Sequence, residues 1–256
     1  MRIATWNVNS VRARLPNVLE WLAKAKPDVL LMQEIKCETA AFPAMDFKAA
    51  GYQTHALGQK SYNGVALASL HPIEEVTEGL KGSSDDEQAR YLEASIKGVR
   101  IASIYLPNGN PIGSEKYTYK IEWMKRLKKR AHDLLQDEAK VVLGGDFNII
   151  PEEIDVHNPK DWEQDALYLP QSRAAFRDIL HLGYTDIFRA LHPKQADYSY
   201  WDYQGGAWQQ DKGIRIDHFL LSPESVDGTI SCVIDRAPRG QEKASDHTPV
   251  IMELRD

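Results

Sequence analysis

The stretch VVLGGDFN, at residues 141–148, joins a short apolar run to two glycines, an acid and an amide. An apolar run of this length is typical of a buried strand, and paired glycines mark a tight turn or a close backbone approach. Asp146 and Asn148 therefore follow the carboxyl end of a strand, where layered α/β proteins usually carry their reactive groups. On its own, the pattern suits an Asx-type turn that closes the strand equally well.

Three other segments place similar polar residues beside an apolar strand. They are residues 3–6 before Asn7, residues 29–32 before Glu34, and the pair Asp246 and His247 before residues 250–254. Polar groups of this kind at strand ends suit Mg²⁺ or Mn²⁺, ions that prefer carboxylate, carbonyl and water oxygens. One metal site shared by all four segments explains the pattern better than four unrelated turns. Taken alone, a glutamate that ends a buried strand is equally suited to pairing with Arg or Lys.

The composition is that of a globular protein, with 256 residues, 43% of them hydrophobic and 27% charged. No apolar stretch approaches the roughly 20 residues needed to cross a bilayer, and strand-like sequence from the start predicts no signal peptide. Two cysteines, Cys37 and Cys232, are too few for a disulfide framework and favour a reducing, cytoplasmic location. The net charge of −6 argues against non-specific coating of nucleic acid, but not against an enzyme that acts on it.

Hydrophobic periodicity predicts helices and strands along the whole chain, with no linker that would divide residues 1–256 into two domains. One predicted helix starts after Arg14, and two others cover residues 114–136 and 173–182. The predicted strands are residues 28–32, 64–69, 91–97, 99–105, 140–145, 216–221, 229–234 and 250–254, and residues 151–170 are predicted to be rich in loops. This order indicates packed sheets covered by helices. The basic run at 125–130 is better explained as a solvated helix face than as a nucleic-acid patch.

Taken together, these segments resemble the exonuclease III family of apurinic/apyrimidinic (AP) endonucleases, part of the endonuclease/exonuclease/phosphatase superfamily. The likeness runs nearly from end to end, through residues 6–12, 33–36, 105–109, 145–148, 201–203, 215–217 and 245–247. The Asp-x-Asn and Ser-Asp-His pieces are shared across the superfamily, whereas Trp-Asp-Tyr and Arg-Ile-Asp are narrower and favour the AP endonuclease branch. Ile35 stands where many members have Thr, and Asn9 where some have Asp. The implied fold is a DNase I-like, four-layer αββα sandwich of two mixed sheets flanked by helices.

The resemblance also implies a role for each polar residue at the strand ends. Glu34 is the first-choice Mg²⁺ ligand, with Asn7 beside it, and Asp246 shares the ion directly or through water. Asp146 orients and deprotonates the attacking water, and Asn148 holds that water or the phosphate. His247 contacts the scissile phosphate, while Asp217 accepts a hydrogen bond from its other ring nitrogen. Tyr105 and Asn108 bracket the phosphate, a role that only the family match favours over an ordinary turn.

Two further sets of residues are candidates for substrate binding. Contacts to backbone phosphates, which carry no sequence information, are expected from Arg12, Arg90, Lys116 and Asn158. A small pocket for a flipped-out abasic deoxyribose is expected from Tyr200, Trp201, Trp208, Ile214 and Ile216, some of which also belong to the core. Each of these residues, taken alone, is more often a solvated charge, a turn residue or part of the core.

The implied activity is Mg²⁺-dependent cleavage of DNA on the 5′ side of abasic sites in base excision repair, leaving a 3′-hydroxyl. Trimming of blocked 3′ ends and 3′→5′ exonuclease activity on duplex DNA are expected to accompany it, in a monomer. A relative that hydrolyses a lipid or inositol phosphate is the second hypothesis, and residues 201–203 and 215–217 argue against it. A non-enzymatic DNA-binding protein is the third, and the presence of Glu34, Asp146 and His247 makes it the weakest.

Overall fold

The apolar run at residues 141–143 lies in β8 (Val141–Asp146), in the interior of a six-stranded sheet of the computed structural model, which describes residues 1–255. β8 pairs in parallel with β7 (Val99–Tyr105) and antiparallel with β10 (Asp217–Leu221). The strand order is β5-β6-β7-β8-β10-β9. The other strands of this sheet are β5 (Glu74–Glu78), β6 (Tyr91–Ile96) and β9 (Thr185–Asp186).

The second six-stranded sheet has the order β11-β12-β1-β2-β4-β3. β1 (Arg2–Asn7) runs parallel to β2 (Val29–Gln33), so both strands end at the same edge of the sheet. The remaining strands are β3 (Gln53–Leu57), β4 (Val65–Ser69), β11 (Thr229–Ile234) and β12 (Val250–Leu254).

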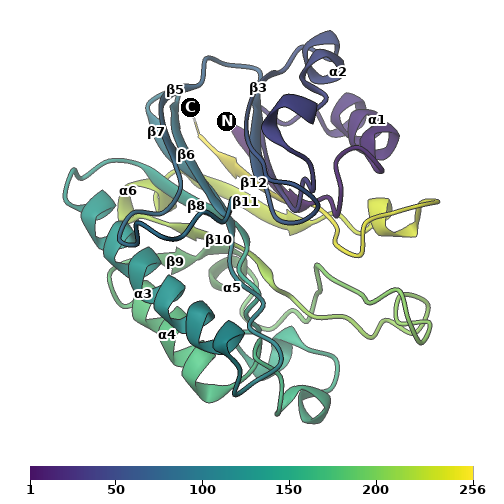
Figure 1. Ribbon diagram of the computed structural model, residues 1–256, viewed down its shortest axis with the longest axis vertical. Coiled ribbons are helices and arrows are strands. Elements are labelled where there is room, and N and C mark those ends of the chain that lie inside the picture. The colour runs from purple at the N-terminus through teal and green to yellow at the C-terminus, as the bar shows by residue number, and fades with distance from the viewer. Residues whose placement is uncertain (256) are drawn as a thin grey trace.

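Helices cover the outer face of each sheet (Figure 1). α1 (Leu15–Ala25) and α2 (Ala44–Ala49) lie on the β1 side, and α3 (Glu115–Leu135) and α4 (Pro170–Leu180) lie on the β8 side. Shorter pieces are α5 (Ile187–Leu191), α6 (Pro223–Val226) and four 3₁₀ helices at Thr39–Ala41, Glu153–Asp155, Pro159–Trp162 and Ala237–Gly240. The four-layer αββα sandwich of two mixed sheets is confirmed. None of the helices formed by residues 1–255 has the length and apolar character needed to cross a membrane.

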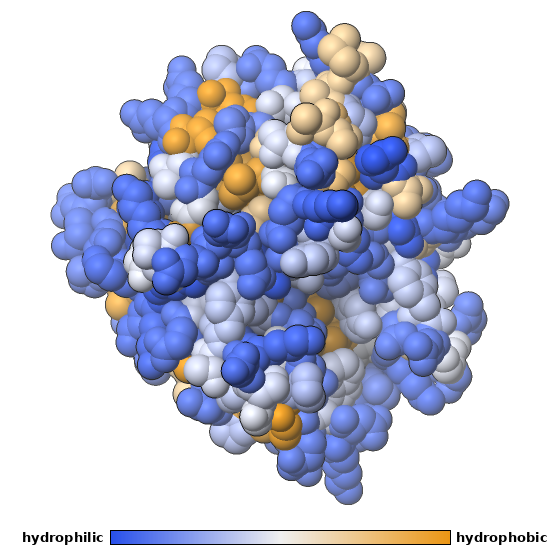
Figure 2. All heavy atoms as spheres, viewed as in Figure 1, coloured by the Kyte–Doolittle hydropathy of each residue, from blue (hydrophilic) through white to orange (hydrophobic). Residues whose placement is uncertain are grey.

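The two glycines of β8 allow the sheets to pack closely against each other. A Cβ atom added to Gly144 would lie 2.6 Å from both Leu31 Cδ1 and Phe219 Cε1, inside the core between the sheets. A Cβ atom added to Gly145 would lie 2.0 Å from the carbonyl oxygen of Ile104 on the neighbouring strand. The close backbone approach predicted from the sequence is therefore confirmed at both positions. Seen from outside, the face in Figure 2 is mostly hydrophilic, with hydrophobic residues in separate patches.

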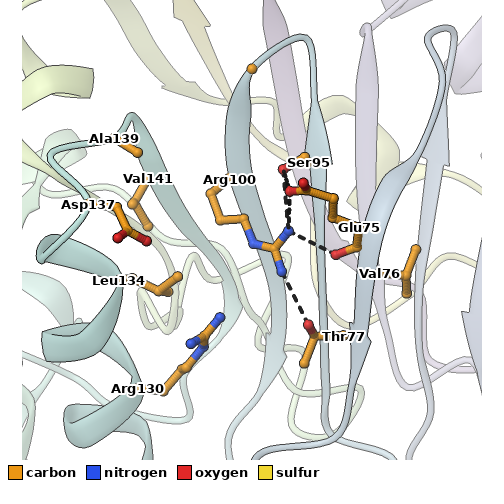
Figure 3. Close-up of a pocket in the computed structure, with 11 residues that line it drawn as sticks. Glu75, Val76, Thr77, Ser95, Arg100, Arg130, Leu134, Asp137, Ala139 and Val141 are labelled. Atoms are coloured by element: carbon orange, nitrogen blue, oxygen red, sulfur yellow. Dashed lines mark hydrogen bonds and ion pairs between the residues drawn. The ribbon is translucent and has the colours of Figure 1, made fainter.

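Several elements were not predicted, and their sequences explain why. The edge strand β5 has the sequence EEVTE, which lacks the apolar face of a buried strand. It is held instead by Arg100 of β7, which donates to the Glu75 carbonyl at 2.8 Å and to Thr77 Oγ1 at 3.2 Å (Figure 3). The buried Glu93 accepts hydrogen bonds from Arg100 and from Arg130 of α3.

The short α2 and the half-exposed β3 were missed as well, and α4 begins at Pro170, three residues earlier than predicted.

A buried charge network anchors the start of β10. The guanidinium of Arg215 is fully buried and donates to Asp155 Oδ1 at 2.7 Å and Asp186 Oδ2 at 2.8 Å. It also donates to His218 Nδ1 at 2.9 Å, while His218 Nε2 lies 2.9 Å from the carbonyl oxygen of Ile149. Because Nδ1 accepts from an arginine, the imidazole is neutral here. Burial and the charge of Arg215 lower the pKa of His218 to about 4.

This histidine should make the protein less stable in mild acid. Its pKa of about 4 lies below the value of 6.5 for an unperturbed histidine, so between these values the unfolded chain binds a proton that the folded one does not. The stability contributed by neutral His218 is therefore complete above pH 6.5 and falls as the pH drops, by about 2 kcal/mol between pH 7.5 and pH 5. Urea unfolding at both pH values should show that His218→Gln removes most of this difference. The exposed His132→Gln control should retain it, and an equal loss in both variants would contradict the assignment.

Candidate active site

The polar residues that follow the strands meet at one edge of the sandwich. The amide nitrogen of Asn7, at the end of β1, donates to Glu34 Oε1 and to Asp146 Oδ2, both at 2.9 Å. Glu34 follows β2 and Asp146 ends β8, so this one side chain ties the two sheets together. His247 comes from the loop before β12, and its Nε2 lies 3.7 Å from Asp146 Oδ2. The convergence predicted for these four residues is therefore present in the structure.

The backbone is unusual where these side chains leave their strands. Asn9, Glu34 and Asn148 have positive φ angles of 43°, 49° and 46°, and Lys36 has one of 51°. Residues other than glycine seldom adopt this left-handed conformation, which is costly and clusters at functional sites. The turns therefore aim the side chains at a common point instead of continuing the strands.

Glu34, Asp146 and His247 have the geometry of a metal site. One ligand atom from each lies within 4.8 Å of the others, and two carboxylates with one imidazole suit a divalent cation. In this structure the ammonium of Lys36 lies 2.8 Å from Glu34 Oε2. Although burial raises it, Lys36 and Asn7 hold the pKa of Glu34 below its usual value. Glu34 is thus an anion that attracts a cation.

Two predicted metal ligands, Asn7 and Asp246, are not among these three residues. The side-chain oxygen of Asn7 accepts a hydrogen bond from the backbone N–H of Asn9 at 3.0 Å, which turns its nitrogen toward the carboxylates. In this orientation the nitrogen of Asn7 positions Glu34 and Asp146, and metal binding by its oxygen stays a prediction. Asp246 is half-buried, and its Oδ1 accepts from Asn9 Nδ2 at 3.0 Å, so it borders the group through Asn9.

His247 and Asp217 form a buried pair behind the metal group. His247 Nδ1 lies 2.8 Å from Asp217 Oδ2, which is the contact predicted from the sequence. Burial lowers the pKa of His247, but the carboxylates of Asp217 and Asp146 outweigh it and raise that pKa above its usual value. Burial also raises the pKa of Asp146, which the charge of His247 only partly offsets. The site therefore contains an imidazolium beside a carboxylate with raised proton affinity.

A second cluster of polar groups lies beside Asp146. The backbone N–H of Asn148 donates to Asp146 Oδ1 at 2.9 Å, and the amide of Asn108 donates to Asn148 Oδ1 at 3.2 Å. Burial and the negative charge of Glu34 raise the pKa of Tyr105, so its phenol stays protonated and can donate. The guanidinium of Arg90 lies 4.7 Å from the centre of the Tyr105 ring. These residues lie beside Asp146 and Glu34, and their role in holding a phosphate stays a prediction.

Lys120 was missed by the sequence analysis. It is fully buried on the inner face of α3, and its Nζ donates to the carbonyl oxygens of Asn108 and Asn148 at 3.0 and 2.7 Å. Burial lowers its pKa to about 7. The available signal was its spacing, three residues before Trp123 and seven before Leu127, which places it on the apolar stripe of the helix.

Two grooves lined by cations open next to the site. The first, of about 490 Å³, includes Arg90, Asn108 and Lys116, three of the predicted substrate contacts. The second, of about 440 Å³, is lined by Ala13, Arg14, Tyr203, Arg239, Gln241, Lys243 and Ala244, and joins the site through a hydrogen bond of 3.3 Å from Asn9 to Tyr203. No carboxylate lines either groove. Arg12 is exposed beside the second groove, and Asn158 is half-buried at the start of a 3₁₀ helix.

The five predicted pocket residues differ in exposure. Trp201, Ile214 and Ile216 are buried at 0–2% relative exposure, whereas Tyr200 and Trp208 are half-buried. The Tyr200 ring packs edge-on against His247, with ring centres 5.0 Å apart. Tyr200 therefore borders His247, the backbone N–H of Trp201 donates to the carbonyl oxygen of Asp246 at 2.9 Å, and a pocket role for all five stays a prediction.

Comparison with known proteins agrees with this geometry. Residues 4–247 match the endonuclease/exonuclease/phosphatase family. The chain belongs to this family. It is 34% identical to the DNA repair nuclease APEX1 of Danio rerio, over 99% of this chain and 82% of that protein. It superimposes on an AP endonuclease from Archaeoglobus fulgidus with a TM-score of 0.96 and 39% identity, over 100% of both chains.

A third similar protein is represented by two structures, one of them bound to DNA. The 3′-5′ exonuclease NExo of Neisseria meningitidis superimposes with a TM-score of 0.98 and 39% identity, over 100% of both chains. A second NExo structure, of a variant described as a 3′ phosphatase and bound to a product DNA hairpin, gives the same TM-score. The resemblance to the exonuclease III and AP endonuclease proteins is confirmed.

Proposed function

We propose that this protein is a DNA repair nuclease that cuts the phosphodiester bond on the 5′ side of an abasic site and leaves a 3′-hydroxyl. We also propose that it trims blocked 3′ ends and removes nucleotides from the 3′ ends of duplex DNA. The observation that carries the proposal is the group of Glu34, Asp146 and His247, with Asp217 bonded behind the histidine. The relatives named above support it, because their names describe a DNA repair nuclease, an AP endonuclease and a 3′-5′ exonuclease.

The metal group fits Mg²⁺, with Mn²⁺ as the alternative. Glu34 and Asp146 would hold the ion, and Asp246 would share it directly or through water. Mg²⁺ usually keeps several of its waters, so few protein ligands are needed. When bound, the ion neutralises charge on the phosphate oxygens during hydrolysis. Glu34 also has the lysine partner that its place at a strand end allows, because the ammonium of Lys36 lies 2.8 Å from its Oε2.

The protein's own residues would carry out the proton transfers and hold the phosphate. Asp146 would accept a proton from the attacking water, which its raised pKa favours near neutral pH. The His247 imidazolium would donate a hydrogen bond to a phosphate oxygen, with Asp217 fixing the orientation of the ring. Tyr105 and the amides of Asn108 and Asn148 would hold the remaining phosphate oxygens.

The two grooves give the DNA strand a path across the site. Both are lined by cations, and phosphates of the strand on either side of the cut would occupy them. The two cysteines are free, which supports a reducing cytoplasmic location.

A contact between Lys116 and a backbone phosphate predicts a specific salt dependence. Lys116→Ala should weaken binding equally for abasic and undamaged duplexes, and should reduce the slope of log affinity against log salt by about 1. The measurement is fluorescence anisotropy of labelled duplex at several salt concentrations, with Asp146→Asn in every protein to prevent cleavage. Lys125→Ala on the exposed face of the same helix is the control and should leave the slope unchanged. An unchanged slope for Lys116→Ala would remove this residue from the DNA path.

The proposal is tested by comparing three labelled duplexes, each with Mg²⁺ and with EDTA. One carries a single tetrahydrofuran analogue of an abasic site, one ends in a 3′-phosphate, and one is undamaged. An AP endonuclease cuts the first duplex once, faster than it shortens the third. Phosphate removal and progressive shortening without the internal cut would assign the protein to 3′-end processing, as in NExo. Activity on none of them, with folded protein and metal present, would contradict a nuclease function.

A further inference from the structure

Lys120 occupies a position where a helix of this kind carries an apolar side chain. It lies on the inner face of α3, with Trp123, Met124 and Leu127 on the same stripe, and has 0% relative exposure. Burial of an ammonium group is costly unless the group is fully engaged in polar contacts. The two contacts that Lys120 makes lead to the active site.

The ammonium joins two loops that leave neighbouring strands. Its Nζ donates to the carbonyl oxygen of Asn108, in the loop after β7, at 3.0 Å, and to that of Asn148, after β8, at 2.7 Å. The side chains of the same two asparagines are bonded to each other at 3.2 Å. The loops are therefore connected by their amides and by the lysine beneath them, in addition to the bond of 2.9 Å from Asn148 Nδ2 to the carbonyl oxygen of Leu106.

The aliphatic part of Lys120 also supports the first loop. Gly109 has a φ of +89°, and a Cβ atom added to it would lie 2.6 Å from Lys120 Cδ. The loop backbone thus rests directly on the lysine stem. On its other side the loop is tied by Asn110, whose amide lies 3.1 Å from both carboxylate oxygens of Asp165. A change at Lys120 would shift this loop relative to Asn148.

We infer that Lys120 is a positioning residue. It fixes the backbone carbonyls of Asn108 and Asn148, and it thereby holds their side-chain amides where they can bind the phosphate. This inference rests on the proposed nuclease function. Its effect passes through the two amides, because Lys120 lies behind them and is sealed from solvent. A misplacement of about 1 Å in a group that binds the reacting phosphate can lower a rate by about 10²-fold.

The test is a comparison of Lys120→Met in two backgrounds. In the otherwise wild-type protein, kcat on the tetrahydrofuran duplex should fall by about 10²-fold, with KM changed by less than about 3-fold. In the Asn108→Ala/Asn148→Ala background, the same substitution should lower the residual kcat by less than about 3-fold, because no amide remains to be misplaced. An equal loss in both backgrounds, or no loss in the first, would overturn the inference. Lys125→Met on the exposed face of α3 is the matched control and should change neither value.

A second variant disturbs the contact between the loop and the Lys120 side chain without removing the lysine. Gly109→Ala pushes the loop away from the lysine stem and should also lower kcat in the wild-type background but not in the double-alanine background. It decides the question if Lys120→Met unfolds, which thermal unfolding will show. An unchanged kcat for folded Gly109→Ala would overturn the inference. Failure of the wild-type protein to cut the duplex would instead contradict the proposed function itself.

Discussion

Replacement of Asp146 by asparagine is expected to lower the rate of cleavage at an abasic site by about 10²–10⁴-fold. Asparagine has nearly the same shape and can keep the hydrogen bond that Asp146 Oδ1 accepts from the backbone of Asn148 at 2.9 Å. It cannot, however, take a proton from water, and it removes one of the two carboxylates of the metal group. The measurement is the single-turnover rate on the tetrahydrofuran duplex at saturating Mg²⁺.

The control for this substitution is Asp137→Asn, an exposed residue beyond the other end of β8. It should leave the rate unchanged, and both variants should have the wild-type unfolding temperature within a few degrees. A rate for Asp146→Asn within 10-fold of wild type would contradict its role as the proton acceptor. A large loss of stability in that variant would mean that the carboxylate is needed for folding.

The second large effect is expected at Asp217, which holds His247 in its charged form. Asp217→Asn should reduce the rate at neutral pH by about 10²-fold, because the imidazole loses its charged partner at 2.8 Å. Since the carboxylates raise the pKa of His247, removal of one lowers that pKa, and the imidazolium is lost at a lower pH. The alkaline decline of the rate should therefore move to lower pH. The measurement is the single-turnover rate as a function of pH.

Two comparisons make the result at Asp217 specific. Asp227→Asn, at an exposed acid after α6, should leave the pH profile unchanged. His247→Gln should lower the rate at least as much and remove the alkaline decline, because no imidazole is left to titrate. An Asp217→Asn protein with the wild-type profile would show that the histidine does not depend on this carboxylate.

The sheets and the catalytic residues were predictable because strong local patterns lead to them. Apolar runs in the sequence marked β1, β2, β8 and β12. Each of these runs has a polar residue of the site near one of its ends. The strand β5 could not be found in this way, because it is held by the side chain of Arg100 and has no apolar face of its own. Its existence depends on partners distant in the sequence.

Other parts of the site depend on three-dimensional contacts that no local pattern records. The orientation of Asn7 is set by the backbone of Asn9, and this makes its nitrogen a donor to two carboxylates. The second groove joins Arg14 to Arg239, more than two hundred residues away along the chain. Lys120 was overlooked because charged residues are expected on the outer face of a helix, and its partners are backbone carbonyls of two separate loops.

The central claim, that the residues around Glu34 form one metal-dependent centre that cuts DNA at abasic sites, is tested most directly by mapping the cut itself. A duplex labelled at its 5′ end, with one tetrahydrofuran analogue, is incubated with Mg²⁺ and either wild-type protein or Glu34→Gln. The wild type should first give a product that ends just before the analogue in a 3′-hydroxyl that a DNA polymerase can extend, and Glu34→Gln should give almost none at the same Mg²⁺ concentration. No cleavage by folded wild-type protein, or equal cleavage by both proteins, would contradict the account.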